Sequence, residues 1–135
     1  MTGTATSALR GLRVFVAEDE LLIAQLLGKI LVSLGCTVIG PVGNLGEALQ
    51  AIRTNDIDGA LLDVQLGESS IYPALDELVQ RGIPFVLLTG HGNLVGSPAH
   101  LNNAPLLTKP FTLRQLENMM SGTFRIRNQG EPRPP

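Results

Sequence analysis

The stretch Gly59-Ala60-Leu61-Leu62-Asp63 is a short apolar run that ends in a carboxylate, and it decides the fold. An unbroken apolar run of this length is typical of a strand that is buried on both faces of a parallel sheet. A charged residue at the end of such a strand lies at the carboxyl edge of the sheet, where open α/β folds place their sites. The stretch therefore predicts a doubly covered sheet with Asp63 as a functional residue at its edge.

Three other apolar runs also end in polar residues. If all four runs are parallel strands of one sheet, right-handed crossovers bring their carboxyl ends to the same edge. We therefore expect the polar ends to meet near Asp63, although they are far apart in the sequence. The runs are Val14–Ala17 followed by Glu18 and Asp19, Phe85–Leu88 followed by Thr89, and Pro105–Thr108 followed by Lys109.

Helical patterns alternate with the predicted strands. This alternation predicts an α/β fold, a five-stranded parallel sheet covered by helices on both faces. The crossover between Thr89 and Leu106 is rich in glycine and contains Pro98, so we expect it to be short, irregular and mobile. The predicted strands are 12–17, 37–40, 57–62, 84–88 and 106–107. Four helices are predicted: the first spans 20–34, the second is capped by Asn44 and Glu47, the third runs from Ser70 or Tyr72 to Arg81, and the fourth is capped by Thr112 and Gln115.

Length and composition indicate one domain. The chain has 135 residues and a formal net charge of −2, and Cys36 is its only cysteine, so an intrachain disulfide is excluded. No dense Lys/Arg stripe indicates direct nucleic-acid binding. No apolar run is long and uninterrupted enough for a membrane span or a signal peptide, so we expect a cytoplasmic protein.

The ends of the chain differ in composition from its middle. We expect a flexible leader at 1–11, one folded domain at 12–121, and a tail at 122–135 that is disordered beyond residue 128. Within the tail, Phe124 and Ile126 alternate with arginines. The pattern leaves two alternatives open: these side chains dock on a partner, or they pack back on the core.

The predicted cluster has a defined chemistry. Two carboxylates about 4 Å apart repel each other by roughly 4 kcal/mol at an effective dielectric constant of 20. Glu18, Asp19 and Asp63 should therefore recruit a hard divalent cation, and oxygen ligands with room for water favour Mg²⁺. With Lys109 and the Thr89 hydroxyl beside it, such a site can hold a phosphoryl group, and Asp63 is the natural nucleophile.

Taken singly, each of these residues also has an ordinary structural explanation. Glu18 or Asp19 could cap the first helix, Asp63 could be a turn residue, and Lys109 could be a solvated surface lysine. Their joint occurrence, in order and at strand ends, favours the functional interpretation.

Four motifs together resemble the receiver domains of two-component response regulators. The resemblance covers the chain from Leu12 to about Met120, and it implies a flavodoxin-like sheet with the strand order 2-1-3-4-5. The motifs are Val16-Ala17-Glu18-Asp19-Glu20, Leu61-Leu62-Asp63-Val64, Leu88-Thr89-Gly90 and Thr108-Lys109-Pro110-Phe111.

The resemblance implies a role for each site residue. Glu18, Asp19 and Asp63 would bind Mg²⁺, with the backbone carbonyl of Gln65 as a further ligand. Asp63 would be the phosphoacceptor, Thr89 would bind the phosphoryl group and report its arrival, and Lys109 would pair with that group. The resemblance also implies a cis peptide bond between Lys109 and Pro110.

A narrower resemblance is to single-domain, stand-alone regulators with a Phe-Ala-Thr-Gly-x-Gly type of motif, which are associated with sensor histidine kinases of the HWE/HisKA-2 kind. Here Leu87-Leu88 replaces the Phe-Ala of that motif. Many receivers carry an aromatic residue three positions before the lysine, where this chain has Leu106. We therefore expect the loop after Thr89, rather than an aromatic side chain, to be the switching element.

These motifs predict a signalling switch rather than an enzyme. Its expected partner is a histidine kinase or a phosphotransfer protein, and the sequence leaves a homodimer open. One rival is a phosphatase that forms an aspartyl-phosphate through an Asp-x-Asp motif, whose second acid corresponds to Gln65 here. Another rival is a receiver-like binding module that has lost phosphorylation. A nucleotide binder lacks support, because Gly28-Lys29 follows no glycine-rich loop.

Overall fold

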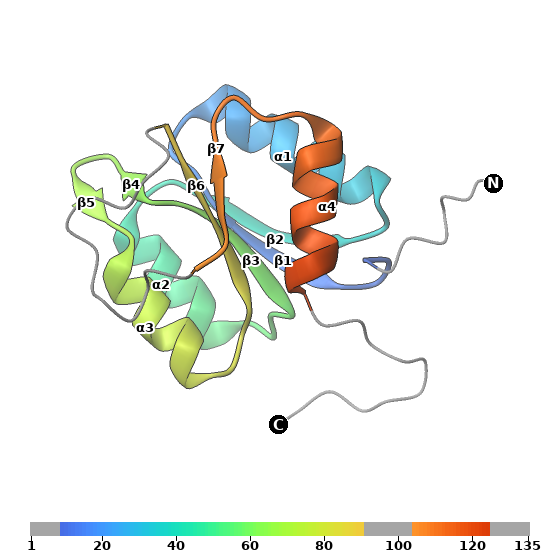
Figure 1. Ribbon diagram of the computed structural model, residues 1–135. Coiled ribbons are helices and arrows are strands. Elements are labelled where there is room, and N and C mark those ends of the chain that lie inside the picture. The colour runs from blue at the N-terminus through green and yellow to red at the C-terminus, as the bar shows by residue number, and fades with distance from the viewer. Residues whose placement is uncertain (1–8, 91–103, 125–135) are drawn as a thin grey trace.

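The computed structural model describes residues 9–90 and 104–124, and its centre is a five-stranded sheet (Figure 1). The strand order is β2-β1-β3-β6-β7, and every neighbouring pair is parallel. This is the predicted order 2-1-3-4-5, so the predicted fold is confirmed. The strands are β1 (Arg13–Ala17), β2 (Thr37–Val42), β3 (Gly59–Asp63), β6 (Phe85–Thr89) and β7 (Leu106–Thr108).

Helices cover both faces of the sheet. Helices α2 and α3 lie together on one face, and α1 and α4 lie on the other (Figure 1). The pattern follows from the right-handed crossovers that join parallel strands. The helices are α1 (Leu21–Ser33), α2 (Leu45–Thr54), α3 (Tyr72–Gln80) and α4 (Leu113–Thr123).

Alternation along the strands divides the core in two. Strand β3 is buried at all five positions. Its consecutive residues Leu61 and Leu62 point to opposite faces of the sheet and belong to different core clusters. Leu62 packs with buried residues of α2 and α3, whereas Leu61 packs with residues of α1 and α4 such as Leu27 and Leu116. A strand enclosed on both sides needs apolar residues at every position, which explains the unbroken run before Asp63.

Local signals fix where the helices begin and end. The Asn44 side chain accepts a hydrogen bond from the Glu47 backbone N–H at 2.8 Å. Thr112 and Gln115 form a reciprocal capping box at the start of α4. Gly35, which follows α1, has a φ of +87°, a conformation that favours glycine. The predicted caps at Asn44 and Thr112 are therefore confirmed.

The apolar pattern of α1 is divided between core and solvent. Leu22 and Leu26 fit the helical periodicity of this segment, but their side chains are 80% and 53% exposed. The buried residues are Ala24, Leu27 and Leu31, which recur at intervals of three and four and face the sheet. Helix α1 therefore presents a second apolar surface to solvent.

Two features after strand ends were not predicted. Strand β2 continues past Gly40 to Val42, with a register shift against β1 and a φ of +99° at Gly40. A small antiparallel hairpin follows β3, formed by β4 (Gln65–Leu66) and β5 (Ser69–Ser70). Two-residue strands are too short to leave a periodic pattern in the sequence.

Both ends of the fold extend beyond the expected limits. Leu9, assigned to a flexible leader, has no exposed surface and packs in the core beneath α1 and α4. Helix α4 continues to Thr123, and the Phe124 side chain is only 3% exposed. Of the two alternatives for Phe124, packing on the core is the one observed. The predicted irregular crossover, apart from Gly90 and Ala104, and the tail beyond Phe124 lie outside the described residues.

Across residues 9–90 and 104–124, the structure contains no helix of the length and apolarity that a membrane span requires.

The contact between Gly59 and Phe124 gives a stability prediction. A Cβ added at Gly59 would lie 2.8 Å from two Phe124 ring carbons, whereas one added at Gly28 in α1 would meet nothing within 4 Å. We expect Gly59→Ala to lower the free energy of unfolding by about 1–3 kcal/mol through overpacking. The control Gly28→Ala should raise it by about 0.5–1 kcal/mol, because alanine favours the helix. Urea titration measures both changes, and equal stability of Gly59→Ala and the parent protein would contradict the packing.

Candidate functional site

The centre of the site is an ion pair between the ends of two strands. Asp63 is the last residue of β3, and Lys109 directly follows β7. The Lys109 Nζ lies 2.8 Å from the Asp63 Oδ2, and their side chains are 14% and 11% exposed. The shared carboxyl edge of the parallel strands brings together residues that are 46 positions apart.

Glu18 completes a three-residue charge cluster. It follows β1 directly, and its side chain is fully buried. The Glu18 Oε1 accepts a hydrogen bond from the Lys109 Nζ at 2.7 Å, and the Glu18 Oε2 accepts one from the Glu20 backbone N–H at 3.0 Å. One ammonium group therefore bridges two buried carboxylates, which leaves one negative charge uncompensated when both are ionised.

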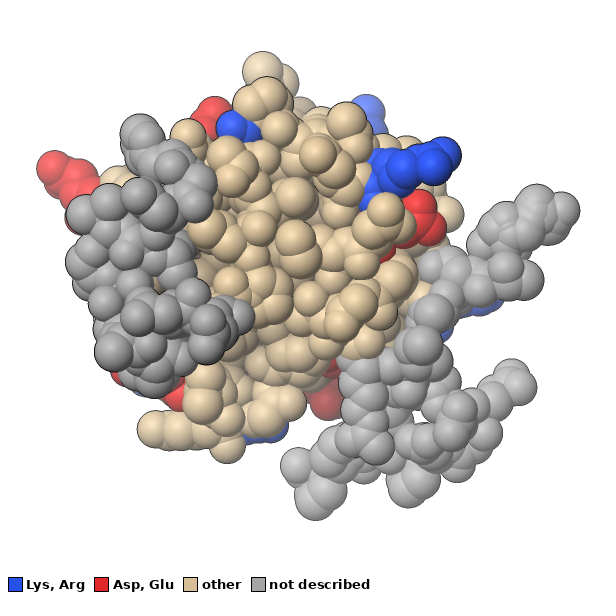
Figure 2. Space-filling view, in the orientation of Figure 1, with Lys and Arg blue, Asp and Glu red and all other residues tan. Residues whose placement is uncertain are grey.

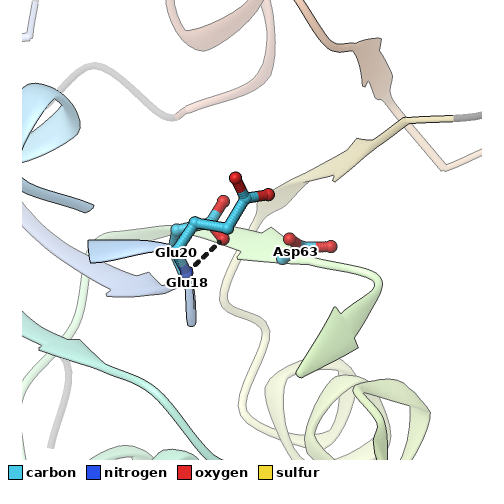
Figure 3. A group of neighbouring side chains, drawn as sticks. All are labelled: Glu18, Glu20 and Asp63. Atoms are coloured by element: carbon cyan, nitrogen blue, oxygen red, sulfur yellow. Dashed lines mark hydrogen bonds between the residues drawn. The ribbon is translucent and has the colours of Figure 1, made fainter. Parts of the chain in front are cut away.

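Glu20 also joins this cluster, although it was not among the predicted site residues. The carboxylates of Glu18, Glu20 and Asp63 offer oxygen atoms that all lie within 4.8 Å of one another (Figure 3). The Glu20 Oε1 is 3.6 Å from the Lys109 Nζ, and the Glu20 side chain is 63% exposed. The feature of the sequence that could have identified Glu20 is its place as the third acid in the run Glu18-Asp19-Glu20.

Asp19 lies next to this group with a different contact. Its Oδ2 accepts a hydrogen bond at 2.8 Å from the backbone N–H of Gly67, in the turn of the β4–β5 hairpin. The Gln65 N–H donates to the Asp63 Oδ1 at 3.0 Å, and the Gln65 side chain donates to the Gly67 carbonyl at 3.1 Å. The hairpin is therefore hydrogen-bonded to two of the predicted metal ligands, Asp19 and Asp63.

Thr89 ends β6 beside this cluster. It is 6% exposed, and its backbone carbonyl accepts a hydrogen bond from the Lys109 N–H at 2.7 Å. Asp63 pairs in register with Leu88, the residue before Thr89. The peptide bond between Lys109 and Pro110 is cis, as the resemblance implied. The strand ends thus gather Glu18, Asp63, Thr89 and Lys109 at one edge, with Asp19 and Gln65 adjoining.

Burial and charge shift two pKa values in the cluster. Desolvation raises the pKa of Glu18 to about 7, and repulsion from Asp63 adds to this, although hydrogen bonds from Lys109 and the Glu20 N–H oppose it. For Lys109, desolvation acts to lower the pKa, but hydrogen bonds and attraction from Asp63 and Glu18 outweigh it, so the pKa lies above its usual value. A proton on Glu18 thus removes the excess negative charge of the cluster.

An apolar groove runs from the acidic cluster along α1. Its volume is about 870 Å³. Glu18 and Asp19 lie at one end of the groove, and Val32 and Ser33 line it at the carboxyl end of α1. The wall formed by β2 and the loop after it contributes Val38, Pro41, Val42 and Gly43.

The site combines the Asp63 carboxylate, the partly buried ammonium of Lys109 and the hydroxyl of Thr89. An ionised Asp63 can attack an electrophilic phosphorus, and Lys109 and Thr89 can stabilise the phosphoryl oxygens by charge and hydrogen bonding. The oxygen-only donor set of the acidic cluster matches the preference of hard divalent cations. The arrangement is therefore suited to phosphoryl transfer to a carboxylate.

The raised pKa of Glu18 predicts that the metal-free protein loses stability as the pH rises from about 4.5 to about 7. In this window the folded state keeps a proton that the unfolded state has lost, so the free energy of unfolding falls with pH. Lys109 titrates above the window. Glu18→Gln is the control, because its amide does not titrate. Across this pH window in EDTA, we expect the free energy of unfolding of the parent protein to fall by on the order of 2 kcal/mol more than that of Glu18→Gln. Urea titrations at several pH values measure the difference, and parallel curves for the two proteins would refute it.

Comparison with known proteins identifies the family. The sequence model of the family "Response regulator receiver domain" matches residues 14–121. The transcriptional regulatory protein PdtaR of Mycobacterium tuberculosis is 31% identical over 121 residues, which cover 86% of this chain and 59% of PdtaR. This chain therefore spans less than two thirds of the length of that relative.

Solved structures agree with the fold. The solution structure of SdrG from Sphingomonas melonis Fr1 superposes with a TM-score of 0.72 at 34% identity and covers 85% of this chain and 96% of SdrG. The receiver domain of the sensor histidine kinase PA1611 from Pseudomonas aeruginosa superposes with a TM-score of 0.69 at 24% identity. The match covers 82% of this chain and 95% of that domain, whose structure has a magnesium ion coordinated in the active-site cleft. The arrangement of the strand ends and the match over most of the sequence lead to one conclusion: the chain belongs to the receiver-domain family of two-component response regulators.

Proposed function

We propose that this chain accepts a phosphoryl group on Asp63 from a phosphohistidine of a partner protein and thereby acts as a signalling switch. The observation that carries the proposal is the contact of the Lys109 Nζ with both Asp63 and Glu18, at 2.8 and 2.7 Å. This contact places a fixed cation beside the nucleophilic carboxylate, where negative charge accumulates during transfer.

The transfer exchanges one bond to phosphorus for another. An Asp63 oxygen forms the new O–P bond while the P–N bond to the imidazole breaks, and the electron pair of that bond stays on the imidazole nitrogen. Lys109 neutralises the phosphoryl oxygens, and the Thr89 hydroxyl donates a hydrogen bond to them. Water later hydrolyses the acyl phosphate and resets Asp63. Gln65 offers no second acid for the leaving group, so the phosphatase alternative has no support in the site.

The acidic cluster fits a bound Mg²⁺. Three carboxylates supply oxygen atoms within 4.8 Å of one another, and Lys109 is their one close cation among the residues described. We propose that Glu18, Asp63 and the Gln65 carbonyl hold the ion, and that Asp19 contributes the carboxylate oxygen that does not bond to Gly67. When bound, the ion would supply charge neutralisation for the phosphoryl oxygens.

The donor protein must dock around the opening of this site. Leu21 and Leu22 of α1 follow the acids directly and are 70% and 80% exposed, and Leu26 continues the surface at 53%. An exposed apolar stripe beside a reactive residue marks a protein-binding surface. We propose that this face of α1 docks a histidine kinase or phosphotransfer protein. The motif Thr89-Gly90-His91-Gly92 resembles that of the stand-alone regulators described above, and this resemblance favours a kinase of the HWE/HisKA-2 kind.

A second surface, formed by β7 and α4, is available for output. Figure 2 shows few charged side chains over β7 and α4 in the coloured part of the surface. Leu113 at the start of α4 is 52% exposed. We propose that a target protein or a second copy of the chain binds through α4, and that phosphorylation of Asp63 controls this binding.

Substitution of the proposed acceptor tests the function. We expect Asp63→Asn to abolish labelling by acetyl phosphate, because the amide cannot form the acyl phosphate. The control Asp76→Asn removes an exposed carboxylate on α3 and should label as the parent protein does. Intact-protein mass spectrometry detects the added phosphoryl group. Undiminished labelling of Asp63→Asn would reject Asp63 as the acceptor.

Metal binding gives a second test of the proposed site. At Mg²⁺ concentrations about a hundred times the dissociation constant, the free energy of unfolding should rise by about 2.7 kcal/mol. Asp63→Asn should reduce this gain, since it removes one charged ligand, and Asp76→Asn should not. Thermal unfolding with increasing Mg²⁺ measures the gain. An unchanged melting temperature at saturating Mg²⁺ would show that the acidic cluster does not hold the ion.

A further inference from the structure

Glu20 is the exposed member of the acidic cluster. Its side chain is 63% exposed, whereas those of Glu18 and Asp63 are 0% and 11% exposed. Its backbone is held in place, because its N–H donates to the Glu18 Oε2 at 3.0 Å. Its Oε1 is 3.6 Å from the Lys109 Nζ. The Glu20 carboxylate therefore lies on the solvent side of Lys109, the lysine that is proposed to neutralise the phosphoryl oxygens.

The role of Glu20 as a helix cap does not account for this position. Glu20 is the N-cap residue of α1, but its side chain makes no capping hydrogen bond. Serine, threonine, asparagine and aspartate are the residues preferred at an N-cap for that bond. The Glu20 carboxylate is instead directed to the cluster, where its charge acts on Lys109.

We propose that Glu20 determines which phosphodonors reach Asp63, by repelling free donors in proportion to their negative charge. This inference rests on the proposed function of Asp63. A phosphoryl group that approaches Lys109 must pass a fixed carboxylate within a few ångströms of that ammonium, at a distance where charges in partly exposed sites still interact strongly. A protein donor differs, because docking on α1 covers Glu20 and can bring a cation against it.

Two small donors of different charge separate this role from a structural one. Acetyl phosphate is a dianion at neutral pH, whereas phosphoramidate carries a protonated nitrogen and one net negative charge fewer. In both reactions an Asp63 oxygen forms the O–P bond. The P–O bond to acetate breaks in the first and the P–N bond to ammonia in the second, and the electron pair leaves with acetate or ammonia. A change confined to folding would affect both donors equally.

The experiment compares the rates at which Asp63 is labelled in the full chain, at saturating Mg²⁺ and low ionic strength. We expect Glu20→Gln to accelerate labelling by acetyl phosphate about three- to tenfold, and labelling by phosphoramidate by a clearly smaller factor. Glu20→Lys should accelerate labelling further, and again more for acetyl phosphate than for phosphoramidate. The acceleration should shrink at high ionic strength, because salt screens exposed charges. The control Asp76→Asn makes the same change in net charge on α3 and should alter neither rate.

The outcomes distinguish the inference from the function on which it rests. Equal acceleration of both donors, or no acceleration in Glu20→Gln, overturns the role of Glu20 while Asp63 remains the acceptor. A Mg²⁺ titration of each variant ensures that the rates are compared at saturation. If the parent protein takes a phosphoryl group from neither donor, the proposed function fails, and the inference about Glu20 fails with it.

Discussion

The bridge from the Lys109 ammonium to two buried carboxylates is the interaction on which the site depends. Ionised carboxylates that lose water are costly unless a charge or a hydrogen bond compensates them. Lys109 meets both Glu18 and Asp63 at hydrogen-bond distance, yet one cation cannot balance both. The remaining negative charge is what would favour a cation in the proposed metal site. Burial of the Glu18 carboxylate, with added repulsion from Asp63, raises the pKa of Glu18 to about 7.

The sheet is the constraint that makes this bridge possible. Strands β1, β3, β6 and β7 are parallel neighbours, so four residues from distant parts of the sequence reach one edge without any local motif that joins them. Apolar runs that end in charges could therefore be read as strands converging on a site. The parallel sheet and the union of Glu18, Asp63 and Lys109 were predictable for this reason, whereas the strand order was implied by the resemblance to receiver domains. The helix caps at Asn44 and Thr112 were predictable as well, because they depend on residues only three positions apart.

Features that depend on side-chain direction could not be predicted in this way. The sequence placed Asp19 and Asp63 at one site, but the Asp19 contact with Gly67 requires a hairpin that is too short to be recognised. Glu20 looked like the first residue of a helix, and only its reach toward Lys109 reveals its place in the cluster. In α1, two apolar stripes satisfy the same helical periodicity, and only packing shows that Leu27 rather than Leu26 faces the sheet. The burial of Leu9 and Phe124 likewise depends on tertiary contacts.

The packing of Phe124 on Gly59 fixes the position of the last residue that the structure describes. Gly59 is the first residue of β3 and Asp63 is the last, so Phe124 is anchored at the edge of the sheet opposite the acidic cluster. A fluorescent protein or a biotin tag joined directly after Phe124 would therefore start from the side of the domain opposite the acidic cluster. Immobilisation by that end on a biosensor chip would leave the phosphorylation pocket facing the flow of analyte.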